Sequence, residues 1–120
     1  MKICLIGHNL TNFIIALELI KKGFKVDILY EYEAKQEKTN RTIGISKNNF
    51  DFLSLNFKEL YKYSWPITKI KIFNHRNNPN EFLDFSTEDK IFFLVKYTDL
   101  FNLFEKKCKK SKKIHFKLAK

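Results

Sequence analysis

Arginine is scarce in this basic chain of 120 residues. Only Arg41 and Arg76 are present, so lysine supplies almost all of the net charge of +10. Arginine forks make most of the specific contacts that proteins form with phosphates and guanine. A basic net charge is typical of nucleic-acid-binding proteins, but the shortage of arginine argues against such a partner here. We expect no nucleic-acid binding and a solvated lysine surface.

Cysteine and long hydrophobic runs are scarce as well. Cys4 and Cys108 stand inside apolar patterns and not at metal-ligand spacing, so the sequence gives little support for a metal site or a disulfide framework. We expect both to be buried free thiols of a reducing compartment. No apolar run approaches the roughly 20 residues of a membrane span, and the start lacks the features of a signal peptide. The expected compartment is the cytoplasm.

The chain has three glycines, and their scarcity matters most near the start. Residues Lys2 to Ile6 form an apolar run that predicts a buried strand. The letters that follow, GHNLTN, stand where a nucleotide-binding protein would carry G-x-G-x-x-G, but only Gly7 is a glycine. Asn9 tolerates left-handed geometry, although its side chain takes space that a phosphate would use. Asn12 places a branched polar group where helix and strand should pack closely.

A helix and a second strand are predicted after this turn. Apolar residues recur at helical spacing from Thr11 onward, and Gly23 is the expected left-handed stop of the helix. Val26, Ile28 and Tyr30 then alternate as in a strand. A helix that crosses between two strands makes them parallel neighbours with a right-handed connection.

The acidic half of a nucleotide-binding fingerprint is uncertain in position. Such a motif carries an acidic residue about 20 residues on, at the end of the second strand, to hold ribose hydroxyls. Glu31 is the candidate, yet counting from Gly23 and Val26 places the acid at position 30, where Tyr30 stands. The motif alone therefore leaves two interpretations open, a working nucleotide site and a structural α/β unit without a ligand.

Later elements follow from the same signals. The predicted hairpin has one wet face, because Lys69 and Lys71 alternate with isoleucines. In chain order we predict a helix capped by Ser46 that carries Phe50, Leu53 and Phe57, a hairpin of ITKIKIF and EFLDF with a turn at 77–80, a strand at 92–95, a helix opened by Thr98 or Asp99, and a strand in IHFKL.

The order of segments resembles that of a known family. KICLIGHN…ALELIKKGFKVDILYE, then NRTIGISKNNFDFL, WPITKIKIF and FFLVKYTDLFNLF, is similar to the opening of flavin-dependent aromatic hydroxylases, especially those of ubiquinone biosynthesis. In that family a dinucleotide-binding unit precedes an Arg-x-x-x-(Leu/Ile)-Ser segment, a Pro-Ile entry to a sheet, and an N-R-x-L helix start. The resemblance spans nearly the whole chain.

The resemblance implies an α/β fold with a Rossmann-like FAD-binding βαβ unit followed by part of a β-rich substrate domain. Residues 1–60 would belong to the FAD-binding domain, 61–97 to a partial substrate-domain sheet, and 98–120 to a helix and strand that return to the first domain. Family members are much longer, so we expect a fragment, and we expect the isolated chain to be unstable and inactive.

The resemblance also implies roles for five residues. Gly7 and the amides around Asn9 and Asn12 would face the FAD pyrophosphate, Glu31 would meet the adenosine ribose, and Arg41 would lie near the flavin. The implied function is an FAD-dependent monooxygenase, with NAD(P)H as reductant, that hydroxylates a small aromatic substrate such as a polyprenylated ubiquinone precursor. A lipid-tailed substrate would make peripheral contact with the inner face of the membrane useful.

Two alternatives stay open. One is a non-catalytic α/β binding or interaction module with a degenerate nucleotide site, which fits the losses at Asn9, Asn12 and Tyr30, and a threonine, Thr98, where many family members have an arginine that contacts the cofactor. The other is an oxidoreductase that uses the turn for NAD, against which the RTIGIS match argues. No catalytic residue is assigned, since none of the three histidines, His8, His75 and His115, shows a partner in the sequence.

Overall fold

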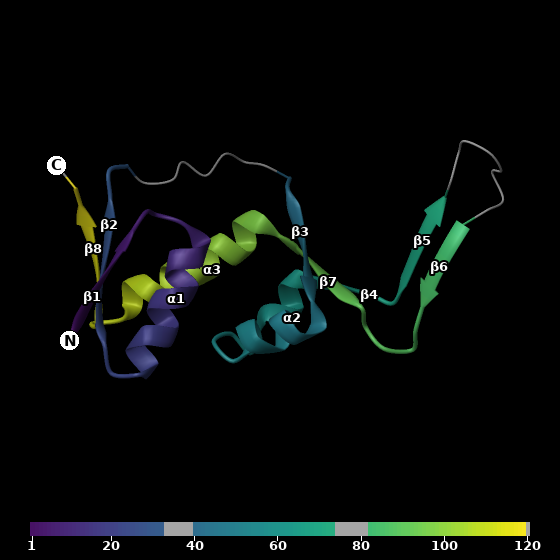
Figure 1. Ribbon diagram of the computed structural model, residues 1–120, viewed down its shortest axis with the longest axis horizontal. Helices are drawn as coiled ribbons and strands as arrows, with labels where there is room; N and C mark the ends of the chain where they lie inside the picture. The colour runs from purple at the N-terminus through teal and green to yellow at the C-terminus, as the bar shows by residue number, and fades with distance from the viewer. Residues whose placement is uncertain (33–39, 74–81, 120) are drawn as a thin grey trace. The chain divides into compact units, whose positions relative to one another are not determined.

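The computed structural model describes residues 1–32, 40–73 and 82–119. The chain divides into two compact units, one formed by Met1–Arg41 with Tyr97–Lys120 and the other by Thr42–Lys96 (Figure 1). Segment 42–60 therefore groups with the strands that follow it and not with the strand–helix–strand elements at the start of the chain. The assignment of residues 61–97 to a substrate domain stays a prediction.

The first unit is a three-stranded parallel sheet with two helices. The strands have the order β1-β2-β8, and β1 pairs with β2 from Lys2↔Lys25 to Ile6↔Leu29. Its elements are β1 (Lys2–Ile6), α1 (Leu10–Lys21), β2 (Lys25–Tyr30), α3 (Tyr97–Lys110) and β8 (Ile114–Leu118). The predicted strand–helix–strand start and the final strand are confirmed. Gly23, at φ +89°, has the left-handed conformation predicted for the end of the helix.

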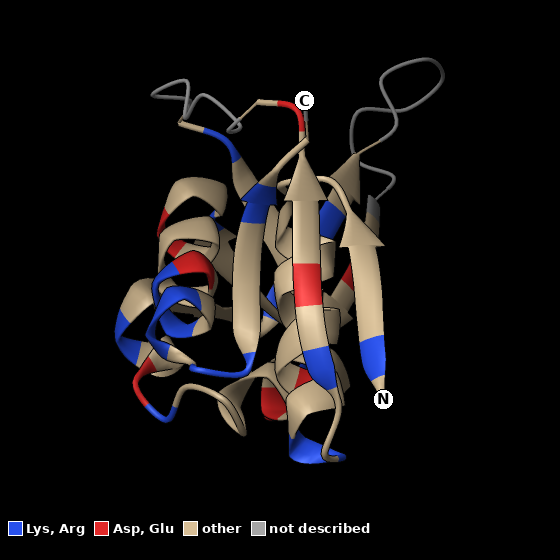
Figure 2. Cartoon of the chain, turned by 90° about the vertical axis from the view of Figure 1, so that its left-hand side faces the viewer, with Lys and Arg blue, Asp and Glu red and all other residues tan. Residues whose placement is uncertain are grey.

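One face of this sheet is covered by helices. Figure 2 shows the three strands in front of the helices, so the opposite face is turned to the viewer. The core between sheet and helices contains fully buried side chains from both strands and helices, among them Phe13, Val26, Ile28 and Phe104. The rings of Phe13 and Phe101 meet edge to face at 5.1 Å. The apolar residues that recur with the helical and strand periods of the sequence therefore lie between the sheet and its helices.

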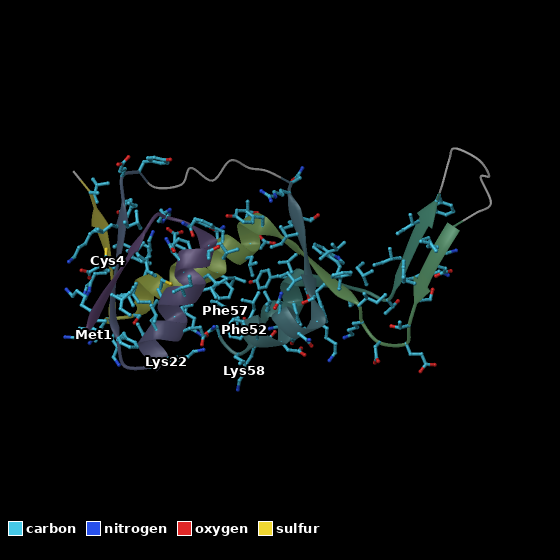
Figure 3. The ribbon with its side chains drawn as sticks, viewed as in Figure 1. Met1, Cys4, Lys22, Phe52, Phe57 and Lys58 are labelled. Atoms are coloured by element: carbon cyan, nitrogen blue, oxygen red, sulfur yellow. The ribbon has the colours of Figure 1, made fainter. Side chains whose placement is uncertain are left out.

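The two cysteines lie in different environments. Cys108 is buried in α3, as predicted, and burial raises the pKa of its thiol to about 12. Cys4 is exposed, so the prediction that it is buried is wrong. Successive residues of a strand point to opposite faces, and Cys4 lies on the face away from α1 and α3 (Figure 3). An apolar run thus predicted the strand correctly but not which of its faces is covered.

The second unit is built from antiparallel strands. Its three-stranded sheet has the order β3-β7-β4, and a separate hairpin pairs β5 with β6. Its elements are β3 (Thr42–Ser46), α2 (Lys47–Ser54), a 3-10 helix η1 (Leu60–Tyr63), β4 (Ser64–Ile67), β5 (Lys69–Phe73), β6 (Phe82–Ser86) and β7 (Phe92–Lys96). The hairpin and the strand at β7 are confirmed, and the predicted turn at 77–80 lies outside the described residues.

Ser46 caps α2 as its sequence position predicts. Its hydroxyl accepts a hydrogen bond from the backbone N–H of Asn49 at 3.3 Å. The rings of Phe50 and Phe93 stack at 3.8 Å between centroids with planes 7° apart. Phe57, expected on this helix, lies beyond it, because α2 ends at Ser54 and the backbone continues in turns.

Candidate functional site

The turn between β1 and α1 depends on Gly7. Its φ of +112° is a conformation that residues with side chains rarely adopt. A Cβ at this position would lie 2.8 Å from Nδ2 of Asn9. The Gly7 N–H donates to the carbonyl oxygen of Leu29 at 2.7 Å, which ties the turn to the end of β2. The first glycine of the motif is therefore required by backbone geometry, and a larger residue would also displace the Asn9 side chain.

Asn9 is the N-cap of α1. Its Oδ1 accepts a hydrogen bond from the N–H of Asn12 at 2.9 Å, and its carbonyl oxygen accepts one from the N–H of Phe13 at 3.2 Å. Its φ of −148° is extended backbone, so the left-handed geometry considered from the sequence is not used. A glycine is thus not needed here for the backbone, and Asn9 differs from glycine mainly in what its side chain does.

Asn12, in the first turn of α1, holds the loop between β1 and α1 through its side chain. Its side-chain Nδ2 donates to the carbonyl oxygens of Ile6 at 2.8 Å and Gly7 at 2.9 Å. The polar group that the sequence places between helix and strand is therefore satisfied by two backbone acceptors. The contact that a third glycine would make by close approach is replaced by hydrogen bonds.

A cavity of about 330 Å³ opens at the carboxyl ends of β1 and β2. This volume is within the range of small-molecule sites. The helix end beside it carries the partial positive charge of the α1 dipole, which favours anions. Its lining residues come from the turn and from the end of β2: Ile6, Gly7, His8, Asn9, Leu29, Tyr30, Glu31 and Tyr32.

Tyr30 is the last residue of β2 and Glu31 follows it, and their side chains have different surroundings. The Tyr30 ring lies 5.4 Å from the His8 ring and 6.4 Å from the Phe116 ring, so it belongs to an aromatic cluster. Glu31 follows the strand directly and, among the described residues, is the one carboxylate that lines the cavity. The counting argument placed the acid at position 30, but Glu31 contributes to the cavity from the next position.

His8 is a site residue whose partner the sequence did not reveal. Its Nε2 lies 2.9 Å from Oε1 of Glu105 on α3, and the Nζ of Lys109 lies 2.7 Å from the same oxygen. The imidazole is buried and contacts the edges of Phe13 and Phe101 rings at 5.2 and 5.6 Å. His8 and Glu105 are 97 positions apart, so no local signal could have paired them.

Arg41 lies apart from the cavity lining. Its guanidinium carbon is 5.5 Å from the centre of the Tyr97 ring, and its carbonyl oxygen accepts a hydrogen bond from the Tyr97 N–H at 2.9 Å. The structure thus brings Gly7, Asn9 and Glu31 together, with Asn12 behind the turn. Arg41 instead connects the entry of β3 to the start of α3.

A second charged cluster lies on the open face of the sheet. Asp27 Oδ2 is 2.6 Å from the Nζ of Lys117 and 3.4 Å from that of Lys2, and Oδ1 is 3.5 Å from Nδ1 of His115. The hydrogen bond from Lys117 lowers the pKa of the Asp27 carboxyl, against the effect of burial. His115 therefore has a neighbour, whereas His75 lies outside the described residues.

In residues 1–32, 40–73 and 82–119, no group of three or more His, Cys, Asp or Glu side chains is placed to hold a metal ion. Within the same ranges, no helix combines the length and the apolar character needed to cross a membrane.

Comparisons with known proteins support the fold through solved structures. No family model matches the chain, and no curated protein matches it. The fold is similar to that of p-nitrophenol 4-monooxygenase PnpA from Pseudomonas putida DLL-E4, with a TM-score of 0.74 and 14% identity over 97% of this chain and 31% of that one.

Two other solved structures give the same picture. The 2,6-dihydroxypyridine-3-hydroxylase from Arthrobacter nicotinovorans has a TM-score of 0.68 and 14% identity, over 96% of this chain and 28% of that one. CtdE, in complex with FAD and substrate 4, has a TM-score of 0.71 and 15% identity, over 97% and 30%. This chain spans less than a third of the length of each. It therefore shares a mixed α/β fold, with a parallel βαβ unit and further strands, with part of these monooxygenase and hydroxylase structures.

Proposed function

We propose that this chain forms part of an FAD-dependent monooxygenase that hydroxylates an aromatic ring. Two fold neighbours are a p-nitrophenol 4-monooxygenase and a dihydroxypyridine hydroxylase, and a third was solved with FAD. The observation that carries the proposal is the cavity at the carboxyl end of the βαβ unit, beside the Gly7 turn and the start of α1. Dinucleotides bind at this place in open α/β sheets.

The residues at the cavity fit a dinucleotide in several respects. Gly7 has no side chain of its own where a phosphate would approach, and the Asn9 amide is the group nearest to the position of a Cβ there. The first-turn N–H groups of Leu10 and Thr11 have no acceptor within a helix that begins at Leu10. Glu31 offers a carboxylate to ribose hydroxyls from the cavity wall. Bound FAD would supply the oxygen chemistry, with NAD(P)H as reductant.

Arg41 and segment 61–97 have proposed roles of a different kind. We assign Arg41 to the flavin side of the cofactor and segment 61–97 to the substrate domain, on the basis of the family resemblance of RTIGIS and WPITKIKIF. The substrate proposed is a ubiquinone precursor with a polyprenyl tail. A lipid-tailed substrate and 21 lysines, from 23 Lys+Arg less two arginines, also favour peripheral contact with an anionic membrane surface. Co-sedimentation with liposomes that does not depend on anionic lipid would contradict that contact.

The second candidate function is a non-catalytic α/β binding or interaction module. The observation that favours it is the asparagine pair, because Asn9 Oδ1 takes a first-turn N–H that an anion would otherwise use. Tyr30 supports it too, since its ring joins the aromatic cluster and offers no carboxylate. Tight FAD binding by the complete protein would exclude this alternative.

The test begins by reading the gene beyond the codon for Lys120 and expressing the complete open reading frame. We expect the purified protein to bind FAD and to oxidise NAD(P)H when an aromatic substrate is added. Glu31→Gln should raise the Kd for FAD about tenfold, because the loss of a hydrogen bond to a charged group weakens binding by about that factor. Glu88→Gln, on an exposed segment of the second unit, is the matched control. No flavin binding under any condition would overturn the proposal.

A further inference from the structure

The two asparagines of the β1–α1 turn use their side chains in opposite directions. Asn9 lines the cavity, and its Oδ1 accepts from the helix N–H of Asn12 at 2.9 Å. Asn12 is not among the cavity-lining residues, and its Nδ2 donates back to the turn at Ile6 and Gly7. One side chain therefore faces the ligand space, and the other faces the turn that shapes it.

We propose that Asn9 limits the affinity of this site for the diphosphate of a nucleotide, and that Asn12 is a positioning residue that holds the turn in its binding shape. The inference rests on the proposed function of the cavity. It divides the two departures from the glycine pattern into one that weakens binding and one that supports it.

The Asn9 side chain competes with a bound anion for a backbone N–H group. An anion at a helix start accepts from first-turn N–H groups, and Asn9 Oδ1 already occupies the N–H of Asn12. The same amide group brings its Nδ2 to 2.8 Å from the position of a Cβ on Gly7, so it lies close over the bare backbone of that glycine. Because φ of Asn9 is −148°, a glycine there would remove the side chain without a change of backbone conformation.

The Asn12 side chain supports the loop between β1 and α1. Ile6 is the last residue of β1, and Gly7 has a φ of +112° that residues with a side chain rarely adopt. Hydrogen bonds from one amide group to both carbonyl oxygens hold the strand end and the turn against α1. Alanine at position 12 would keep the helix but leave these carbonyl oxygens without this donor, so the turn would sample other conformations before a ligand binds.

The experiment compares three variants of the protein expressed from its complete open reading frame. Asn9→Gly should lower the Kd for FAD and for ADP about tenfold, and Asn12→Ala should raise both about tenfold, each the effect of a hydrogen bond to a charged group. Asn49→Ala, in the first turn of α2, is the matched control and should leave both constants unchanged. In the ligand-free protein, Asn9→Gly should also speed hydrogen exchange at the Asn12 amide.

The outcomes separate this inference from the proposed function. Wild-type FAD binding with no gain in Asn9→Gly, or no loss in Asn12→Ala, would overturn the inference and leave the proposed function standing. ADP bound more tightly by Asn9→Gly, with no FAD binding in any variant, would support the inference and overturn the proposed function. No binding of either ligand to any variant would overturn both.

Discussion

The parallel sheet of the first unit and the β5–β6 hairpin of the second bury their apolar residues to very different degrees. Between sheet and helices, Phe13, Phe104 and Ile28 are fully buried. On the hairpin, the exposed fractions are 51% for Ile72, 56% for Phe73, 61% for Leu83 and 52% for Phe85. Both regions have complete strand pairing, so hydrogen bonding does not explain the contrast.

The difference lies in whether a second layer covers the strands. Helices α1 and α3 cover one face of the parallel sheet, and this packing supplies the apolar burial that stabilises a domain. Within residues 1–32, 40–73 and 82–119, no helix covers β5 and β6, and two paired strands alone are marginally stable in water. The alternation in ITKIKIF predicts a strand with an apolar face, but the strand pattern carries no information on what packs against that face.

Removing a buried ring of the first unit should have the largest effect. Phe104→Ala deletes a fully buried side chain of α3 and should lower the free energy of unfolding by about 3–5 kcal/mol through lost burial and a residual cavity. Urea titration monitored by circular dichroism measures it. A loss under about 1 kcal/mol would show that this core is not what holds the unit together.

The open face of the parallel sheet and the helix-side core should differ in thiol reactivity. Cys4 is exposed, and burial raises the pKa of Cys108 to about 12, so a maleimide should label Cys4 at least about a hundredfold faster at neutral pH. The protonated Cys108 thiol stabilises the fold fully below the ordinary pKa of 9.0, and this contribution is lost as pH rises toward 12. Mass spectrometry after timed labelling, with Cys4→Ser as control, measures the rates. Equal rates would place Cys108 outside the core.

A methyl group on the turn glycine should cost less than an emptied core. Gly7→Ala forces a side chain into φ +112° and brings Cβ to 2.8 Å from Asn9 Nδ2, and we expect a loss of about 1–3 kcal/mol in thermal or urea unfolding. Gly44→Ala is the matched control, because its Cβ would meet its nearest side-chain atom, Leu94 Cδ2, at an ordinary 3.9 Å. Equal effects at both glycines would contradict a backbone requirement for glycine at position 7.

The exposed hairpin should give the smallest effect. Phe85→Ala removes a ring that is 52% exposed, and the free energy of unfolding should change by less than about 0.5 kcal/mol. The same measurement as for Phe104→Ala makes the two substitutions directly comparable. A loss as large as that of Phe104→Ala would show that another layer covers the hairpin in the protein as it is expressed.

Much of the candidate site could be predicted from short patterns. An apolar run, a glycine and a helical period near the start are enough to place Gly7 at a turn and Asn9 before a helix, because those signals act over a few residues. The same signals could not give the role of Asn12, since its acceptors, the carbonyl oxygens of Ile6 and Gly7, depend on how the turn folds back. Nor could they show that the Tyr30 ring joins an aromatic cluster, or that Tyr30 and Glu31 both line the cavity.

Local pattern was sufficient for the parallel βαβ start, the antiparallel hairpin and the final strand, because strand and helix periods are properties of neighbouring residues. It did not predict β3, η1 or β4. Only the folded chain decides that β2 lies between β1 and β8, that Cys4 is on the open face of their sheet, and that His8 meets Glu105 from 97 positions away. These outcomes depend on which faces of the strands and helices pack together, because the burial of apolar surface joins segments that are far apart in the sequence.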